Sequence, residues 1–505
     1  MKRSQKLFGA SLLALAISGC AVTSEPIERG VSQQRAKSDL QNMYTGQEPL
    51  SGPLTLHQAM ARAVKYNLEG RLKIMEEALA KRQLDLASFD MLPRMALDAG
   101  YVGRNNVNAS SSQSVETGTQ SLEPSTSQDR DREVADLTMV WNVLDFGVSY
   151  ISAKQQGDQR LIVQERRRKV INTIVQDVRS AYWRAMAAER LLKQIDSLMA
   201  RVETARNNSQ SMSEQRIGDP IQALGYQRSL IEATRQLEEQ RRALSLAKTE
   251  LATLINLPPS TNLTLATQDD YVIPELKVDL ASLEQEALTS RPELREQDYQ
   301  TRISAAETRK AMLRLLPGLE FFCWRALRQQ FVFLVEQGWA DYGVKVTWNL
   351  FNVISAPAAI DVAKAGEEVA TARRQAMSIA VLAQLYVANA NYREAMRQFK
   401  TNQQLSDIDG QIVGQLRNRY QAAGLGELDL IQGELNTLQA DLRRDLSYAD
   451  LRNAYGQIFA SAGLDPLPDE VQSTEVQSIA TALANREEAW AAGNISVPVA
   501  HAPVQ

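Results

Sequence analysis

The sequence predicts a mainly helical protein with a small β-sheet contribution, in which one helix–strand–strand–long helical hairpin unit occurs twice. Three observations carry this prediction. Two sets of residues recur at fixed offsets, short stretches alternate apolar and polar residues with period two, and apolar heptads continue over many turns. The formal net charge of −4 over 505 residues argues against a nucleic-acid surface.

An export signal occupies the start of the chain. Three basic residues within the first six precede an apolar run, Leu7–Ile17, which is too short to span a membrane as a mature helix. We therefore predict a secretory signal over residues 1–19, whose removal takes the net charge from −4 to −7. Ile17-Ser18-Gly19-Cys20 resembles a lipobox, which makes Cys20 the lipidation site and residues 20–53 a lipidated N-terminal segment. An ordinary signal with a chance cysteine is the alternative.

Two correspondences define the repeats. Around the first helix of each copy, residues recur at an offset of 224: Ala63 with Ala287, Glu69 with Glu293, Arg71 with Arg295, Ala87 with Ala311, and Leu92-Pro93 with Leu316-Pro317. Later residues recur at an offset of 207, as in Trp141 with Trp348 and Leu257 with Leu464. We therefore predict repeat 1 over residues 54–270 and repeat 2 over residues 271–468, with the longer insert in the first.

Each copy begins with a helix that leads into a strand. The first helix is predicted from about Leu56 to Leu92, because Pro93 cannot continue it. Alternation from Met95 to Tyr101 then predicts a strand, and the polar stretch from about Asn105 to Arg132 predicts a loop. The return strands alternate in the same way. Their apolar residues are Leu137, Met139, Trp141 and Val143 in the first copy and Val344, Val346, Trp348 and Leu350 in the second.

These strand pairs have two interpretations. Their apolar side chains could face lipid and their polar side chains a lumen, with Trp141 and Trp348 in the aromatic girdle at a membrane interface. A soluble hairpin packed on helices is the alternative. After the signal, no stretch reaches the ~18 apolar residues that a membrane helix needs, so any spanning segment must be made of strands.

Long helical hairpins follow the strands. A strict heptad seam runs through Ile174, Val178, Ala181, Ala185, Ala188, Leu192, Ile195, Met199 and Val202, and the second copy carries Val381, Leu385, Ala388, Tyr392, Ala395 and Phe399. The 71 residues from Gly147 to Gly218 correspond to roughly 100 Å of helix, a length that suits a rod across the periplasm.

Turns break both long hairpins. Asp219 and Pro220 suit the N-cap and first position of a helix, and Glu427 and Asp429 lie in a predicted first helical turn, where the dipole favours anions. Capping is one interpretation of these carboxylates. The other is a gate ring of Asp219, Glu427 or Asp429, repeated by three chains around a tunnel mouth.

The segment from Cys323 to Gln337 departs from the repeat. It shows no alternation, no turn residue and no polar loop, so it predicts a helix where a strand and loop are needed. Our hypothesis is a compensated frameshift that ends near Gly338, because one codon choice shifted by one base encodes an ordinary strand-and-loop composition. If no frameshift is present, this segment is expected to disrupt the third strand and therefore closure of a barrel.

Catalytic and metal-binding motifs are sparse. The two histidines, His57 and His501, stand alone, and we expect His57 at the surface of an amphipathic helix. No phosphate-binding loop, CxxC, HExxH or GxSxG motif occurs, so no catalytic residue and no metal ligand is predicted. Cys323 is the other cysteine, which leaves no intramolecular disulfide if Cys20 carries lipid. Residues 469–505 lack a pattern and are predicted to be a disordered tail.

Together these features resemble the TolC-like outer-membrane efflux proteins, over about Leu54 to Pro468. The matching residues are Leu56 through Asn67, Leu92-Pro93, the Trp-Asn strand ends, Ala181-Tyr182, Ile255-Asn256-Leu257-Pro258 and Ala462-Gly463-Leu464-Asp465-Pro466. The duplication with matched spacing is more specific than any one of these motifs.

The resemblance implies a homotrimeric α/β channel-tunnel that closes a 12-stranded barrel in the outer membrane and extends into the periplasm. It implies no catalysis and no cofactor beyond the lipid. A periplasmic adaptor (membrane fusion protein) would couple the channel to an inner-membrane pump of RND or ABC type, in tripartite efflux or type I secretion. Adaptor docking falls on Ala423-Gly424-Leu425, which matches the family, and on Ile217-Gly218-Asp219, which departs at its last position.

Two other classes of protein share some of these features. A periplasmic adaptor or coiled-coil scaffold lipoprotein also carries an export signal and long hairpins, but it usually has one hairpin flanked by small β domains. An exported enzyme with a helical body is disfavoured by the missing catalytic constellation. The motifs leave the cargo and the pump class undetermined.

Overall fold

The computed structural model describes residues 26–50, 52–126, 129–214, 220–261, 263–266, 271–329, 338–422, 424, 426–467 and 474–495. Its elements are α2 (Arg29–Asn42), α3 (Leu56–Tyr66), α4 (Leu68–Phe89), β1 (Arg94–Gly103), β2 (Asp131–Asn142), α5 (Val143–Glu214), α6 (Pro220–Leu254), α7 (Leu280–Ser290), α8 (Pro292–Leu313), β3 (Gly318–Gln329), β4 (Gly338–Thr347), α9 (Phe351–Gln421), α10 (Glu427–Ser461) and α11 (Val476–Ala491). The order from α3 to α6 recurs from α7 to α10, which confirms the duplicated unit.

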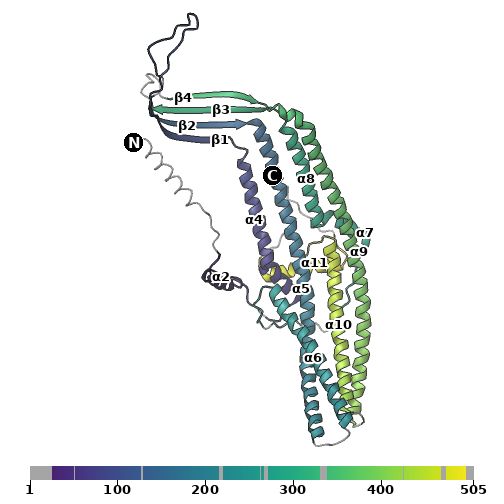
Figure 1. Ribbon diagram of the computed structural model, residues 1–505. Coiled ribbons are helices and arrows are strands. Elements are labelled where there is room, and N and C mark those ends of the chain that lie inside the picture. Colours follow the sequence, from purple (N-terminus) through teal and green to yellow (C-terminus); the bar gives the residue numbers. More distant parts are fainter. Residues whose placement is uncertain are drawn as a thin grey trace.

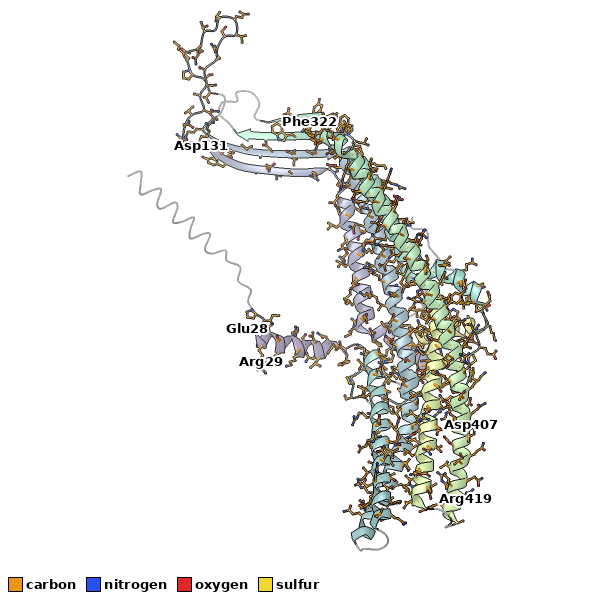
Figure 2. The ribbon with its side chains drawn as sticks, turned by 45° about the vertical axis from the view of Figure 1, so that its right-hand side comes forward. Glu28, Arg29, Asp131, Phe322, Asp407 and Arg419 are labelled. Carbon is orange, nitrogen blue, oxygen red and sulfur yellow. The ribbon has the colours of Figure 1, made fainter. Side chains whose placement is uncertain are left out.

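The molecule is a long rod with a sheet at one end. Figure 1 shows the four strands at one end, the two helical hairpin tips at the other, and α11 near the middle. In Figure 2, Asp131 lies at the end of the sheet away from the helices and Arg419 near the hairpin tips. The 72 residues of α5 account for about 110 Å of this length.

The predicted first helix is interrupted, which corrects the interpretation of residues 56–92 as one helix. Thr55 and Gln58 form a capping box that begins α3. Asn67 then has an extended backbone, and its side chain accepts hydrogen bonds from the backbone N–H groups of Glu69 and Gly70. An asparagine that caps a new helix in this way ends the preceding one. Arg291 lies at the equivalent break in the second copy.

The four strands form one antiparallel sheet in the order β1-β2-β3-β4. The predicted alternation from Met95 to Tyr101 lies within β1, which confirms that strand. The helix predicted from Cys323 is wrong over the described residues, because β3 continues to Gln329 and pairs Cys323 with Met139 and Tyr342. Pairing on both sides satisfies the backbone donors and acceptors of β3, and this outweighs the weak strand pattern. The remainder, 330–337, lies outside the described residues.

The long helices pack side by side along their heptad seams. Near the sheet, α4 packs on α5, α5 on α8 and α8 on α9, and further along α5 also packs on α6 and α10. The predicted seam residues of α9 are all buried, and those of α5 are buried or half-buried, which confirms both seams. Within the described residues, none of the helices combines the length and apolarity required to cross a membrane.

The C-terminal region is ordered, which corrects the predicted disordered tail over its described part. Helix α11 packs against α3, and its buried residues recur at helical spacing: Val476, Ile479, Ala480, Leu483 and Trp490. The Trp490 ring stacks on Phe459 with 5.0 Å between ring centroids. This spacing provides an apolar face that a composition-based interpretation misses. Residues 468–473 and 496–505 lie outside the described part.

An aromatic cluster fixes the junction of the two hairpins. The fully buried Phe399 ring of α9 lies 5.6 Å from that of Tyr271 and 5.2 Å from that of Tyr448. We expect Phe399→Ala to lower the free energy of unfolding by about 3–5 kcal/mol, because it removes a large ring from a packed core. Denaturant titration of the detergent-solubilised protein measures this loss. Leu405→Ala, at a side chain of α9 that is 45% exposed, is the control, expected to change stability by less than about 0.5 kcal/mol.

Candidate functional site: an apolar sheet face, two free edges and the hairpin tips

The sheet has one apolar face. The register aligns Met95, Met139, Cys323 and Tyr342 in one row, and the neighbouring rows on the same face are mostly apolar. Exposed large side chains on this face are Met95, Leu97, Leu137, Met139, Trp141, Leu319, Phe321, Tyr342, Val344 and Val346. An apolar surface of this extent marks contact with lipid or with another protein. Arg325, opposite Leu137 and Ala340, is a charged exception within it.

The opposite face carries most of the charge. Its residues include Arg94, Asp98, Asp136, Glu320, Asp341 and Lys345, which alternate with the apolar positions along each strand. This division into an apolar and a polar face is the pattern expected when one face of a sheet is out of water and the other is in it.

The two predicted girdle tryptophans lie at the end of the sheet where strands lead into helices. Trp141 is the penultimate residue of β2, and its ring lies 5.9 Å from Phe146 and 6.3 Å from Phe321. Trp348 directly follows β4, and its Nε1 donates a hydrogen bond of 3.0 Å to the backbone oxygen of Leu315. Both rings are partly exposed, at 36% and 49%.

A glycine on the polar face makes room for an aromatic ring. A Cβ added at Gly343 would lie 2.6 Å from the Cζ of Phe322, its cross-strand partner. We expect Gly343→Val to destabilise the sheet by about 1–3 kcal/mol through overpacking. Thermal unfolding and protease resistance of the purified protein measure the effect. The second change Phe322→Ala should restore stability to the Gly343→Val protein. A double variant as unstable as the single variant would show that the ring is not the cause.

The sheet has two free edges. Among the described strands, β1 pairs with β2 alone and β4 with β3 alone, so neither has a strand partner on its outer side. The row of helices near the sheet likewise begins with α4 and ends with α9.

Both edge helices expose apolar seams that the sequence interpretation missed. On α9, nine exposed residues follow the spacing 3,4,3,4: Val362, Ala365, Val369, Ala372, Ala376, Ile379, Ala383, Tyr386 and Ala390. On α4, exposed residues follow a heptad pattern: Leu68, Leu72, Met75, Leu79 and Leu86. The same search that identified the buried seam of α9 could have found them, since exposure alone distinguishes the two.

The hairpin tips hold the predicted docking and gate residues. Ile217, Gly218, Asp219, Ala423 and Leu425 lie outside the described residues, as does Cys20. The backbone N–H of Gly424 donates a 3.0 Å hydrogen bond to the carbonyl of Arg419, which ends the α9 hairpin arm.

The two acidic residues at the start of α10 have different surroundings. Glu427 is half-buried and close enough to Tyr226 of α6 to affect its ionisation. Burial raises the pKa of Tyr226, and the charges of Glu427 and Tyr420 raise it further. Asp429 is exposed. Glu427 therefore lies near the hairpin of α5 and α6, whereas Asp429 is accessible to solvent.

Several solved structures are similar to this chain, including the following three. The CmeC outer-membrane channel of Campylobacter jejuni is 12% identical with a TM-score of 0.64, over 83% of this chain and 90% of that one. The open-state MtrE outer-membrane channel of Neisseria gonorrhoeae is 19% identical with a TM-score of 0.60, over 79% and 88%. The outer-membrane protein VceC of Vibrio cholerae is 13% identical with a TM-score of 0.60, over 81% and 96%.

Neither a protein-family model nor a curated protein matches the sequence. Two of these structures are outer-membrane channels and the third is an outer-membrane protein, and all three align with this chain over most of their length. The duplicated order of elements, the four-stranded sheet and the long helical hairpins agree with the resemblance inferred from the repeats. The chain has the fold of the TolC-like outer-membrane efflux channels.

Proposed function

We propose that three copies of this chain form an outer-membrane channel-tunnel of a tripartite efflux or type I secretion system. The observation that carries this proposal is an open four-stranded sheet with one apolar exposed face and an unpaired edge on each side. Lipid offers no partner for an unpaired backbone edge, so such a sheet is stable in a membrane only when neighbouring copies pair with it.

Closure of a barrel by three copies would give each free sheet edge a partner. In a ring of three copies, β4 of one chain pairs with β1 of the next, and α9 packs on the neighbouring α4. Three sheets of four strands then give a barrel of twelve. The small alanines of the α9 seam allow the leucines of α4 to approach closely, as in other helix pairs with alternating large and small residues. The polar sheet face lines the lumen, and Trp141 and Trp348 lie at the membrane interface.

The helical rod extends from this barrel through the periplasm. A lipid on Cys20 anchors the chain to the outer membrane as a second attachment. The hairpin tips dock a periplasmic adaptor, which couples the tunnel to an inner-membrane pump of RND or ABC type. The channel provides the path, and the pump provides the energy and selects the cargo.

Native mass and conductance test the proposal together. Protein extracted in detergent is expected to have the mass of three chains and to form ion-conducting channels in planar lipid bilayers. A folded monomer, or a trimer without conductance, would contradict the channel function. The alternative, a periplasmic adaptor or scaffold lipoprotein, predicts protein that conducts no ions and is released from membranes once its lipid attachment site, Cys20, is replaced.

The exposed carboxylate at the tip makes a separate prediction. In the trimer, three copies of Asp429 surround the tunnel mouth and attract cations. We expect Asp429→Asn to lower the cation-over-anion permeability ratio, measured as the reversal potential in a salt gradient. Asp39→Asn, on helix α2 remote from the tips, is the matched control and should leave the ratio unchanged. An unaltered ratio in Asp429→Asn would show that these carboxylates only cap the helix.

A further inference from the structure

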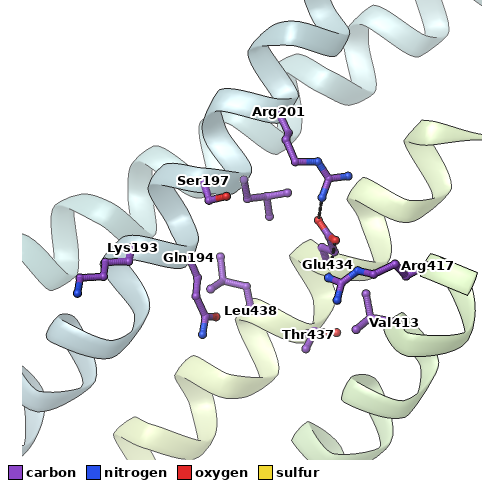
Figure 3. Close-up of a pocket in the computed structure, with 10 residues that line it drawn as sticks. Lys193, Gln194, Ser197, Arg201, Val413, Arg417, Glu434, Thr437 and Leu438 are labelled. Atoms are coloured by element: carbon purple, nitrogen blue, oxygen red, sulfur yellow. Dashed lines mark hydrogen bonds and ion pairs between the residues drawn. The ribbon is translucent and has the colours of Figure 1, made fainter. Parts of the chain in front are cut away.

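A cavity lies between the two helical hairpins. It is bounded by α5, α9 and α10 and has a volume of about 470 Å³. Figure 3 shows Arg201 of α5 and Arg417 of α9 on either side of Glu434 of α10, while Lys193 of α5 lies at the far end of the lining with its side chain directed away from them. The volume lies within the range of small-molecule sites, about 300–1,000 Å³.

The charges of the cavity do not balance. Glu434 bridges the two arginines, accepting a hydrogen bond from Arg201 through one oxygen and a 2.9 Å hydrogen bond from Arg417 Nη2 through the other. Lys193 has no ion pair within the described part of the chain. Two cations therefore flank one carboxylate, and Lys193 adds a third cation at the far end of the lining, which gives the lining an excess charge of about +2.

The arginines retain donors for a second anion. A guanidinium has five N–H donors, and each arginine uses one of its nitrogens on Glu434. Their side chains are 38% and 57% exposed, whereas Glu434 is only 13% exposed. The remaining donors are thus accessible, and paired guanidinium groups suit carboxylate or sulfonate oxygens.

Part of the cavity lining is apolar. Leu198 of α5, Val413 of α9 and Leu438 of α10 form it, and all three are buried. An apolar wall beside a cationic edge fits a molecule with an anionic group on an apolar body. A metal ion does not fit this set, since the described residues include no group of three or more His, Cys, Asp or Glu side chains placed to hold one.

We propose that this cavity binds a small organic anion. Its carboxylate or sulfonate contacts Arg201 and Arg417, and its apolar body lies against Leu198, Val413 and Leu438. Glu434 competes with the ligand for the same guanidinium donors, so the protein carries its own internal competitor. The site lies within one chain, and it therefore does not depend on the proposed channel function.

Isothermal titration of the full-length protein in detergent tests this site, with 4-phenylbutyrate as the probe and 4-phenylbutanol as its uncharged analogue. The acid should bind saturably and the alcohol at least about tenfold more weakly, since hydrogen bonds to charged groups contribute that much affinity. Arg201→Gln and Arg417→Gln should each weaken binding of the acid by about tenfold or more. Equal binding of acid and alcohol, or no saturable binding of the acid, would overturn the proposal.

Removal of the competing carboxylate should change the affinity for the acid in the opposite direction. Glu434→Gln should tighten binding of 4-phenylbutyrate, because the arginines lose their competing carboxylate, and general loss of folding cannot produce this result. Arg241→Gln is the matched control, because Arg241 forms an exposed ion pair with Asp196 away from the cavity. Weaker binding in Glu434→Gln, or an equal loss in Arg241→Gln, would place the anion elsewhere or reduce it to nonspecific attraction.

Discussion

Val369→Asp is expected to convert the trimer into monomers and to abolish channel conductance. Val369 lies in the middle of the exposed α9 seam, and the proposed ring packs this seam against α4 of the next chain. Three carboxylates would then be buried without a partner, at a cost of several kcal/mol at each interface. Native mass spectrometry measures the distribution of oligomers, and bilayer recording measures the conductance.

Gln375→Asp is the matched control for this experiment. Gln375 is exposed on the same helix but lies off the seam, so the same charge there should leave a conducting trimer. If Val369→Asp stays trimeric, the α9 seam is not the contact between copies. If both variants dissociate, the added negative charge causes dissociation wherever it lies on α9, and the seam is not its specific target.

Glu487→Ala is expected to lower the free energy of unfolding by about 3–5 kcal/mol, the usual cost of breaking one side of a buried ion pair. Glu487 of α11 accepts hydrogen bonds from Arg179 of α5 and, at 3.2 Å, from the ring of His57 when its Nε2 is protonated. Arg179 is only 5% exposed. It also lies so close to Gly456 that a Cβ added there would overlap its guanidinium.

Two further variants test the cause of this loss. Glu488→Ala, at the exposed neighbouring position, should change stability by less than about 0.5 kcal/mol. Replacing both partners, Arg179→Met with Glu487→Met, should recover most of the stability, because two apolar side chains leave no unpaired charge. A double variant as unstable as Glu487→Ala would show that packing, not charge, is responsible.

The same ion pair makes stability depend on pH. Burial raises the pKa of Glu487, but Arg179 and His57 offset this effect and hold the pKa at about 2, below its ordinary value of 4.5. The folded protein therefore binds this proton less readily than the unfolded chain does. The contribution is complete above pH 4.5 and is lost as the pH falls toward about 2. Glu487→Gln should remove this part of the acid dependence in unfolding curves recorded between these pH values.

Patterns within single segments were predictable. The alternation around Met95 identified β1, and the heptads on α5 and α9 identified seams that are buried in the structure. Such patterns arise because each side chain's direction follows from the period of its own element. The described part of the tail and the segment from Cys323 to Gln329 were predicted wrongly. The apolar face of α11 becomes evident from its packing against α3, and the strand at Cys323 depends on pairing with its two neighbours.

The candidate sites were predictable only in part. Trp141 and Trp348 lie at the ends of two matching strands and Asp429 lies in the first turn of α10, as the sequence indicates, and their roles stay predictions. The seam along the exposed side of α9 shares its spacing with the buried one, so the sequence does not distinguish them. The cavity around Glu434 joins residues of three helices, and Arg201 lies 233 positions before it.

The sequence by itself determined the duplicated unit, the helix and strand periods, and the resemblance to outer-membrane channels, since these depend on local spacing and on its repetition. Only the tertiary structure decided the sheet order across the two repeats, the docking of α11 through Glu487, and the position of Arg201 and Arg417 on one carboxylate. These contacts join residues far apart in the chain. They form where packed helices and paired strands bring buried charges and unpaired backbone groups to a partner, because burial without one is costly.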